Sequence, residues 1–206
     1  MRKDKVTITI IDYGAGNLRS VAKAFDRLGY RPHITSKAED VLGADILVLP
    51  GVGAASDTLN GLRARGLVEP LKGYMAQGRP FFGVCMGLQV LFDSSEEGEV
   101  ECLGLIPGRV KKLPPDLKVP HMGWNEVAQR RPSPLFEDMP DNAYFYFVHS
   151  YYGDPADKSL MAASTEYGVD FCSVFIKDNL VATQFHPEKS GDMGLKLYGN
   201  FVKHWG

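Results

Sequence analysis

The sequence predicts an α/β fold: an open, mostly parallel central sheet flanked by helices on both faces, with mixed or antiparallel strands added in the second half. Two observations predict it. In the first half, short apolar runs alternate with amphipathic helical patterns, which is the order that βαβ units produce. In residues 104–184, strand-like runs follow one another with turn residues between them and leave little room for helices.

The elements of the first half follow from the spacing of apolar residues. Residues 6–12, VTITIID, favour a strand, and apolar residues at steps of three and four share one face of a helix over residues 16–30. Residues 44–50, ADILVLP, form a continuous apolar run of the kind found in buried parallel strands. The other elements of this half are strands over residues 31–36 and 80–84, helices over residues 59–65 and 68–77, and a helix directly after Cys85.

The second half is predicted to be rich in strands. Short apolar or alternating runs are separated by turn residues, and none is long enough for a typical helix. The predicted strands cover residues 106–113, 121–128, 143–152, 160–165, 171–177 and 180–185. A closing helix over residues 192–204 completes the fold.

Length and composition favour a single domain over residues 1–206. The chain is 44% hydrophobic and 23% charged with a formal net charge of -2, which are values of an ordinary globular protein. There is no basic excess to suggest a nucleic-acid partner, and no apolar run approaches the roughly 20 residues that span a membrane. The N-terminal segment carries an Asp where a signal peptide would be basic, so we expect a cytoplasmic protein.

Cys85 stands where a predicted strand turns into a predicted helix. The surrounding GVCMG sequence has the form of a strand-to-helix elbow, in which glycines tolerate a strained turn that displays the central side chain. A helix N-terminus after the cysteine would favour the thiolate, which is the nucleophilic form. The segment alone is equally compatible with a small buried cysteine at a tight turn.

His186 and Glu188 follow another predicted strand and are separated by Pro187. Residues two apart in an extended segment point to the same side, so the carboxylate could orient the imidazole and leave its second nitrogen to act as a base for Cys85. Pro187 is expected to hold this segment extended. The alternative is a loop histidine in a surface ion pair. Its place at the carboxyl end of a strand, where ligands collect in open α/β sheets, favours the catalytic interpretation.

Residues 50–53, PGVG, follow a third predicted strand and could supply oxyanion donors. Gly51 and Gly53 would let backbone N–H groups point into a crevice beside Cys85, as acyl chemistry requires. A β-branched residue such as Val52 disfavours positive φ, so a peptide flip there would cost on the order of 1 kcal/mol or more and could keep the site inactive. The alternative is an ordinary turn between a strand and a helix.

No motif indicates a metal or a cofactor. Cys85, Cys102 and Cys172 lack C-x-x-C spacing, and the histidines lack the spacing of metal ligands. The glycines of residues 14–19 are followed by Arg19 where a dinucleotide fingerprint needs its third glycine. We therefore expect neither a disulfide framework nor a bound cofactor.

Three motifs together resemble the class I, or triad, glutamine amidotransferases. They come in the order of that family and span essentially the whole chain: PGVG (50–53), GVCMGLQVLF (83–92) and QFHPEKS (184–190). Further stretches are similar to the glutaminase subunits of imidazole glycerol phosphate synthase, an enzyme of histidine biosynthesis. These stretches are IDYGAGNLRSV (11–21), PHMGWNEV (120–127) and YFYFVHSYY (144–152).

The resemblance implies a flavodoxin-like sheet and hydrolysis of L-glutamine by a Cys-His-Glu triad. Cys85 would form a glutamyl thioester, His186 would transfer protons and Glu188 would orient His186. The backbone groups implied to hold the oxyanion belong to Gly51, Val52, Gly53 and Met86. The residues implied to contact glutamine are Gly53, Gln89, His149, Ser150 and Tyr151.

The resemblance also implies a partner. In that family, ammonia passes to a separate (β/α)8 cyclase subunit, and the resulting heterodimer makes imidazole glycerol phosphate and aminoimidazole carboxamide ribotide. The positions implied to meet that partner or to line the ammonia route are Asn17, Trp124, Tyr146 and Lys189. If docking favours a flipped oxyanion segment, the isolated subunit should hydrolyse glutamine poorly.

Two other interpretations stay open. The chain could be a class I amidotransferase of another pathway, such as pyridoxal phosphate, aminobenzoate or purine synthesis, although the HMGWN and YGAGN stretches argue against these. It could instead be a catalytically silent subunit that only binds and regulates. The intact set of Cys85, His186 and Glu188 argues against that interpretation.

Overall fold

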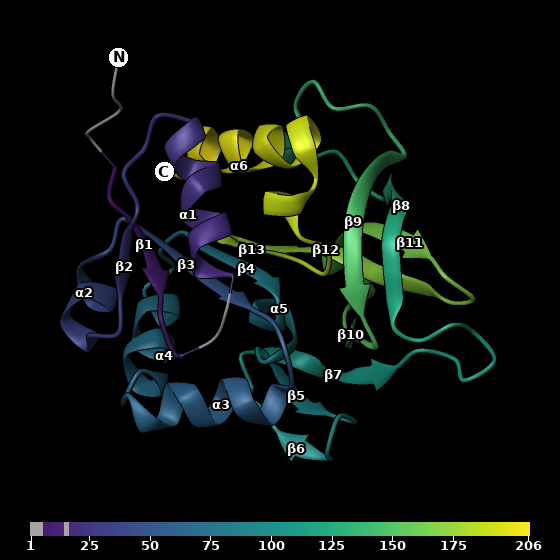
Figure 1. Cartoon of the computed structure of the whole chain (residues 1–206), viewed down its shortest axis with the longest axis horizontal. Coiled ribbons are helices and arrows are strands. Elements are labelled where there is room, and N and C mark those ends of the chain that lie inside the picture. Colours follow the sequence, from purple (N-terminus) through teal and green to yellow (C-terminus); the bar gives the residue numbers. More distant parts are fainter. Residues whose placement is uncertain (1–5, 15–16) are drawn as a thin grey trace.

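The computed structural model describes residues 6–14 and 17–206, and within them a nine-stranded sheet runs through the molecule (Figure 1). The spatial order is β2-β1-β3-β4-β13-β12-β11-β8-β9. The strands from β2 to β13 are parallel to one another, and each later neighbour is antiparallel. The strands are β1 (Ile8–Ile11), β2 (His33–Thr35), β3 (Ile46–Gly51), β4 (Phe81–Cys85), β8 (His121–Gln129), β9 (Ala143–His149), β11 (Met161–Glu166), β12 (Asp170–Lys177) and β13 (Leu180–Thr183).

Helices cover both faces of the parallel part. Figure 1 shows α1 and α6 on one side of the sheet and α3 and α4 on the other. On the first side, the Tyr198 ring of α6 lies 4.6 Å from Phe25 of α1 and 5.1 Å from Phe82 of β4. On the second, Tyr74 of α4 belongs to the same buried cluster as Leu47 of β3. The helices are α1 (Leu18–Arg27), α2 (Ala38–Gly43), α3 (Ala55–Ala64), α4 (Val68–Ala76), α5 (Met86–Gln89) and α6 (Gly191–Trp205), with 3-10 turns η1 (Pro134–Phe136), η2 (Lys158–Leu160) and η3 (Pro187–Lys189).

A smaller four-stranded sheet was not predicted. Its order is β10-β7-β5-β6, formed by β5 (Phe92–Ser95), β6 (Val100–Glu101), β7 (Ile106–Lys112) and β10 (Tyr151–Pro155). The predicted strand over residues 143–152 is broken at Ser150. Its first part is β9 of the large sheet, whereas its second part is β10, which pairs with β7 from Tyr151↔Lys112 onward. This break places the backbone around Ser150 at the junction of the two sheets.

The predicted α/β fold, with a parallel centre and added antiparallel strands, is confirmed. The predicted helix directly after Cys85 is also confirmed; it is one turn long, ends at Gln89 and is followed by β5 from Phe92. The short helix α2 was missed because its six residues, AEDVLG, bury only Val41 and are too few for a helical period to repeat. The first residue of the helix predicted over residues 16–30 lies outside the described residues, and α1 begins at Leu18.

Within the described part of the chain, no helix is both long enough and apolar enough to cross a membrane.

Candidate active site

The elbow at Cys85 is strained, as the sequence predicts. Cys85 ends β4 and directly precedes α5, with φ 53° and ψ -102°, a backbone conformation that residues other than glycine rarely adopt. The glycines beside it permit close backbone packing: a Cβ at Gly87 would lie 1.8 Å from the Leu49 carbonyl oxygen, and one at Gly83 would lie 2.5 Å from the Gly87 carbonyl oxygen. The elbow therefore depends on small residues at both positions.

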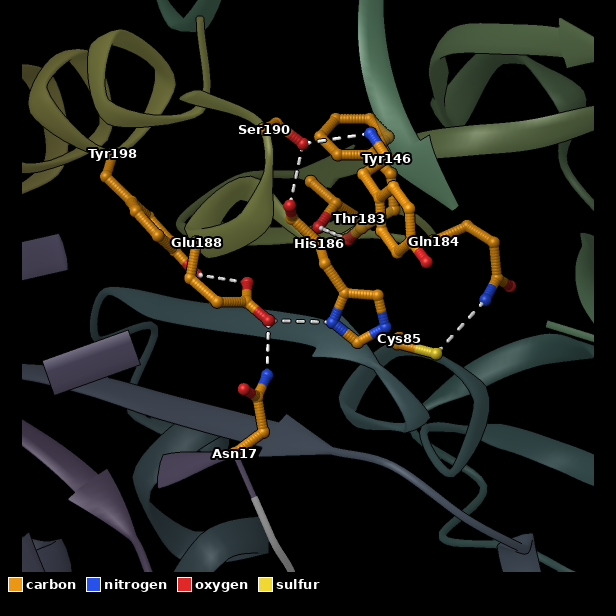
Figure 2. A network of polar contacts seen from close by, with 10 residues as sticks. Asn17, Cys85, Tyr146, Thr183, Gln184, His186, Glu188, Ser190 and Tyr198 are labelled. Carbon is orange, nitrogen blue, oxygen red and sulfur yellow. Dashed lines mark hydrogen bonds and ion pairs between the residues drawn. The ribbon is translucent and has the colours of Figure 1, made fainter. Parts of the chain in front are cut away.

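His186 and Glu188 form a buried pair. Nδ1 of His186 lies 2.7 Å from Oε1 of Glu188, and neither side chain is exposed to solvent. The pairing that the sequence predicts is present, but the backbone differs. Pro187 begins the 3-10 turn η3 instead of an extended segment, so a tight turn brings the two side chains together. Glu188 also accepts hydrogen bonds from the Asn17 side-chain amide and, at 3.4 Å, from the Tyr198 hydroxyl (Figure 2).

Adjacent parallel strands bring the cysteine and the histidine together. Val84 pairs with Thr183 in the β4–β13 ladder, so Cys85 and His186 both follow the carboxyl ends of neighbouring strands. Figure 2 shows the His186 ring with its Nδ1 side toward Glu188 and its Nε2 side toward Cys85. Among the described residues, His186 Nε2 is buried with no nitrogen or oxygen partner, and the Cys85 thiol is the group beside it. This nitrogen is therefore free to exchange a proton with a group held at Cys85.

The protonated form of His186 is favoured. Burial alone lowers the pKa of His186. The charge of Cys85 and the hydrogen bond with its thiol group, followed by the hydrogen bond to Glu188 and the charge of Glu188, outweigh burial and raise this pKa to about 10. Glu188 fixes the tautomer, because its carboxylate can only accept the proton on Nδ1. A thiolate beside an imidazolium is the arrangement of an activated cysteine nucleophile.

Gln184 also contacts Cys85, a role that was not predicted from the sequence. Its Nε2 lies 3.6 Å from Cys85 Sγ, and its Oε1 accepts a hydrogen bond from Gln89 Nε2 at 3.0 Å. Gln89 Nε2 donates as well to the Tyr151 carbonyl oxygen at 2.8 Å, which leaves the buried Gln89 Oε1 with no partner within the described residues. A signal was present: Gln184 lies two residues before His186 at the end of a strand, so the two can face the same side.

A pocket of about 890 Å³ opens at Cys85. Most residues predicted to bind glutamine or an oxyanion line it, and two of the predicted interface residues do so too. These are Val52, Gly53, Met86, Gln89, His149, Ser150 and Tyr151, together with Asn17 and Lys189. Gly51 is not among the lining residues and pairs with Cys85 in the β3–β4 ladder. Among residues 6–14 and 17–206, no group of His, Cys, Asp or Glu side chains is placed to hold a metal ion.

The Val52 backbone contacts Tyr13. Burial raises the pKa of Tyr13 to about 12, and hydrogen bonds from Thr58 and the Val52 backbone partly offset it, while the charge of Cys85 adds to the rise. The Val52 backbone therefore lies beside the Tyr13 hydroxyl, which accepts a hydrogen bond from Thr58 Oγ1 at 3.3 Å.

The other predicted interface residues lie together on β8, β9 and η3. Trp124 and Tyr146 are cross-strand partners with ring centroids 6.1 Å apart, and Lys189 Nζ lies 5.9 Å from the Tyr146 ring centroid. Three neighbouring side chains on β8 and β9 are more than half exposed: Trp124 (56%), Met122 (61%) and Tyr144 (53%). Such a group of large exposed apolar side chains is typical of an interaction surface.

Comparison with known proteins agrees with this geometry. The family model "Glutamine amidotransferase class-I" matches residues 9–205. A protein of Dehalococcoides mccartyi (strain CBDB1) named imidazole glycerol phosphate synthase subunit HisH is 55% identical over 197 residues, which cover 95% of this chain and 96% of the relative. A protein of the same name from Syntrophotalea carbinolica is 50% identical over 202 residues, with 94% of this chain and 98% of the relative covered.

Solved structures share the fold at low sequence identity. The glutaminase domain of a CTPS from Trypanosoma brucei superimposes with a TM-score of 0.66 at 18% identity, covering 98% of this chain and 97% of that chain. The PurLQS structure from Thermotoga maritima contains a chain that matches with a TM-score of 0.77 at 16% identity, covering 98% of this chain and all of that chain (100%). With the family match over nearly the whole length, the chain belongs to the class I glutamine amidotransferases.

Proposed function

We propose that this chain is the glutaminase subunit of an imidazole glycerol phosphate synthase and acts as a single domain in the cytoplasm. Relatives of at least 50% identity that carry this name cover at least 94% of the chain, which supports the assignment within the family. The observation that carries the reaction is the buried His186 Nε2, which faces Cys85 at the pocket.

The arrangement suits the hydrolysis of a side-chain amide. The Cys85 thiolate attacks the amide carbon of L-glutamine, and His186 donates its Nε2 proton to the departing ammonia, which leaves a glutamyl thioester. The neutral Nε2 then takes a proton from water, which attacks the thioester and releases glutamate. Glu188 stabilises the imidazolium and holds its ring in place at both steps.

The pocket offers groups for both ends of the substrate. Gln89 Oε1 is a buried acceptor without a partner among the described residues, and it suits the ammonium group of an amino acid. Backbone N–H groups of Val52 and Met86 are the proposed oxyanion donors, with Gly51 and Gly53 giving the segment room to turn. The Val52 backbone lies beside the Tyr13 hydroxyl, and we propose that this segment rearranges before the Val52 N–H serves as a donor.

We assign the exposed face of β8 and β9 to the partner. The proposed partner is a (β/α)8 cyclase subunit that forms a heterodimer with this chain and consumes the ammonia. Trp124, Tyr146 and Lys189 form one continuous group on this face, and Lys189 also lines the pocket. Asn17 lines the same pocket and binds Glu188, so the partner face and the triad meet at its edge.

The test is glutamine hydrolysis by the purified chain with and without the cyclase subunit. We expect slow hydrolysis alone, a large increase in the complex, and a fall of more than about 1000-fold in kcat for Cys85→Ala in the complex. The Cys85→Ala complex should still cyclise with added ammonia. Near-normal hydrolysis by Cys85→Ala would remove this residue from the mechanism, and stable pairing with a synthase of another pathway would overturn the assignment.

Cys102→Ala is the matched control. Cys102 is half-buried and lies outside the pocket. Burial raises the pKa of its thiol to about 11; the charge of Arg63 opposes this rise and the charge of Glu97 adds to it. This thiol stays protonated at neutral pH, so its removal should leave kcat unchanged.

A further inference from the structure

Two buried histidines face each other beside the pocket. His121 of β8 and His149 of β9 are direct cross-strand partners, and Nδ1 of His121 lies 2.9 Å from Nε2 of His149. Nδ1 of His149 lies 2.9 Å from the Tyr151 carbonyl oxygen, and Nε2 of His121 lies 3.3 Å from Asn125 Nδ2. The side chains thus form a continuous chain of hydrogen bonds that ends at the pocket wall.

The two ends of this chain fix both tautomers. A carbonyl oxygen only accepts, so His149 must carry its proton on Nδ1 toward Tyr151. Nε2 of a neutral His149 then accepts from Nδ1–H of His121, which leaves Nε2 of His121 as the acceptor for Asn125 Nδ2. The Asn125 amide is itself fixed, since its Nδ2 donates to the Glu166 carbonyl and its Oδ1 accepts from a backbone N–H.

The surroundings keep the pair neutral. The His121 ring stacks between Tyr167 and Phe147, with centroids 4.0 Å and 4.9 Å away, and His149 meets the Phe171 ring at 5.0 Å. Burial lowers the pKa of His121 to about 4. Burial also lowers the pKa of His149 to about 3, against the effect of the Tyr151 hydrogen bond and helped by the charges of His121 and His186.

The chain continues through the Tyr151 carbonyl to the nucleophile. The same carbonyl oxygen that accepts from His149 also accepts from Gln89 Nε2 at 2.8 Å. Gln89 in turn donates to Gln184, whose amide nitrogen lies 3.6 Å from Cys85 Sγ. The Tyr151 carbonyl is therefore held by His149 and, in turn, holds the side-chain amide of Gln89 at the pocket.

We propose that His121 is a positioning residue for glutamine binding. Its Nδ1–H donates to Nε2 of His149 and holds that ring where its own Nδ1–H meets the Tyr151 carbonyl, which in turn holds Gln89 at the pocket. This inference rests on the proposed function. If His149 carried its proton on Nε2 instead, its Nδ1 lone pair would face the Tyr151 oxygen at 2.9 Å and repel it. Gln89 would then lose its acceptor, and its free Oε1 would leave the position where it meets the substrate.

The activity test is His121→Phe, assayed with the cyclase subunit. The phenyl ring keeps the stacking and removes the N–H, so KM for glutamine should rise about tenfold, the effect of one lost buried hydrogen bond, while kcat stays within about threefold. His121→Asn keeps an N–H near the Nδ1 position and should restore KM to within about threefold of the wild-type value. An increase in KM of less than about threefold in His121→Phe would overturn the proposal.

A tautomer measurement tests the proposal without any activity. Two-bond ¹⁵N–¹H correlation spectra distinguish Nδ1–H from Nε2–H imidazoles, and with five histidines in the chain single substitutions assign each signal. His149 should be the neutral Nδ1–H form in the wild type. The signal of its Nε2 should change in His121→Phe, where that nitrogen loses its donor, and should stay near the wild-type position in His121→Asn. A wild-type His149 in the Nε2–H form refutes the proposal even if His121→Phe fails to fold. Absent glutamine hydrolysis in the wild-type complex, by contrast, would count against the proposed function and leave this readout intact.

His33→Phe is the matched control. His33 lies on β2, at the opposite edge of the nine-stranded sheet from β9, and it is exposed. Among the described residues, its side chain forms a hydrogen bond with Asp40 alone. KM for glutamine and the His149 tautomer should both be unchanged in this variant.

Discussion

His186 and His149 are both buried near one pocket, yet their protonation is opposite. His186 has no exposed side-chain surface and His149 is 5% exposed, so burial alone favours the neutral form of each. The anionic neighbours Cys85 and Glu188 overcome burial at His186 and raise its pKa to about 10. At His149 burial prevails and lowers the pKa to about 3. The partners of a buried imidazole, and not its depth, decide its charge.

The difference divides the pocket into two chemical parts. In the first part, His186 lies between Glu188 and Cys85, and the proposed function requires this imidazole to transfer protons. In the second part, His121 and His149 are neutral and make directional hydrogen bonds, which fix the positions of their neighbours and add no positive charge next to His186. The two imidazoles of one pocket thus suit different tasks.

Among the changes that test the contrast between the two histidines, removing the charge of Glu188 should have the largest effect on kcat. Glu188→Gln keeps the size of the side chain and removes the negative charge that stabilises the His186 imidazolium. We expect kcat for glutamine hydrolysis in the complex to fall about 100-fold, within the usual range for general acid–base groups. The measurement is steady-state glutaminase activity with the cyclase subunit bound.

Tyr198→Phe is the control for that variant. It removes only the 3.4 Å hydrogen bond to Glu188 Oε2 and keeps the ring that packs against Phe25 and Phe82. Its kcat should stay within about threefold of wild type, because a long hydrogen bond contributes little. Equal effects of the two substitutions would show that the charge of Glu188 has no special role.

A substitution at Tyr13 should have a smaller effect and should increase the rate of glutamine hydrolysis. Tyr13 is close enough to Cys85 for the charge of Cys85 to raise its pKa. Tyr13→Phe removes the hydroxyl beside the Val52 backbone and should destabilise the present conformation of that segment relative to one that turns the Val52 N–H toward the pocket. Glutamine hydrolysis by the isolated subunit should rise at least about threefold, the effect of releasing one hydrogen bond.

Thr58→Val separates the two bonds of the Tyr13 hydroxyl. Thr58 Oγ1 donates to that hydroxyl at 3.3 Å, and its loss leaves the Tyr13 oxygen available to Val52. Basal hydrolysis should be unchanged in Thr58→Val. If Tyr13→Phe leaves basal hydrolysis unchanged as well, the Val52 N–H is not restrained by this hydroxyl.

The charged part of the site could be predicted from the sequence because its signals are local. Cys85 lies between glycines at a strand end, and His186 and Glu188 are two residues apart, so each motif fits within a few residues. The parallel strands that bring these motifs together follow from continuous apolar runs. The family resemblance added the substrate and the partner.

The neutral part could not be predicted, because it depends on register between strands. Nothing near His121 in the sequence indicates that it lies opposite His149; only the β8–β9 ladder places the two together. The break at Ser150 is hidden for the same reason. Residues 143–152 form one apolar run, and the run divides because Leu113 bonds the Ser150 carbonyl and β10 pairs with β7.

The two histidine environments also predict opposite effects of pH on stability. In the unfolded chain each imidazole titrates at about 6.5. The folded pKa of His186 is raised, so its contribution is present below about pH 6.5 and is lost as pH rises toward about 10. The folded pKa values of His121 and His149 are lowered, so the unfolded chain binds more protons below about pH 6.5 and stability falls as pH decreases toward about 4.

His121→Asn should reduce the loss of stability that accompanies a decrease in pH. Comparing the free energy of unfolding in urea at about pH 7.5 and about pH 5.5, we expect the wild type to lose about 1 kcal/mol more than this variant, which is the effect of one imidazole that protonates only when unfolded. Carboxylates with lowered pKa values, such as Asp40 and Asp154, are common to both proteins and cancel in the difference. His33→Asn replaces an exposed histidine, so its free energy of unfolding should fall between the two pH values by nearly as much as that of the wild type. An equal loss in the wild type and His121→Asn would mean that His121 is protonated in the folded protein, which contradicts a neutral pair and removes the contrast with His186.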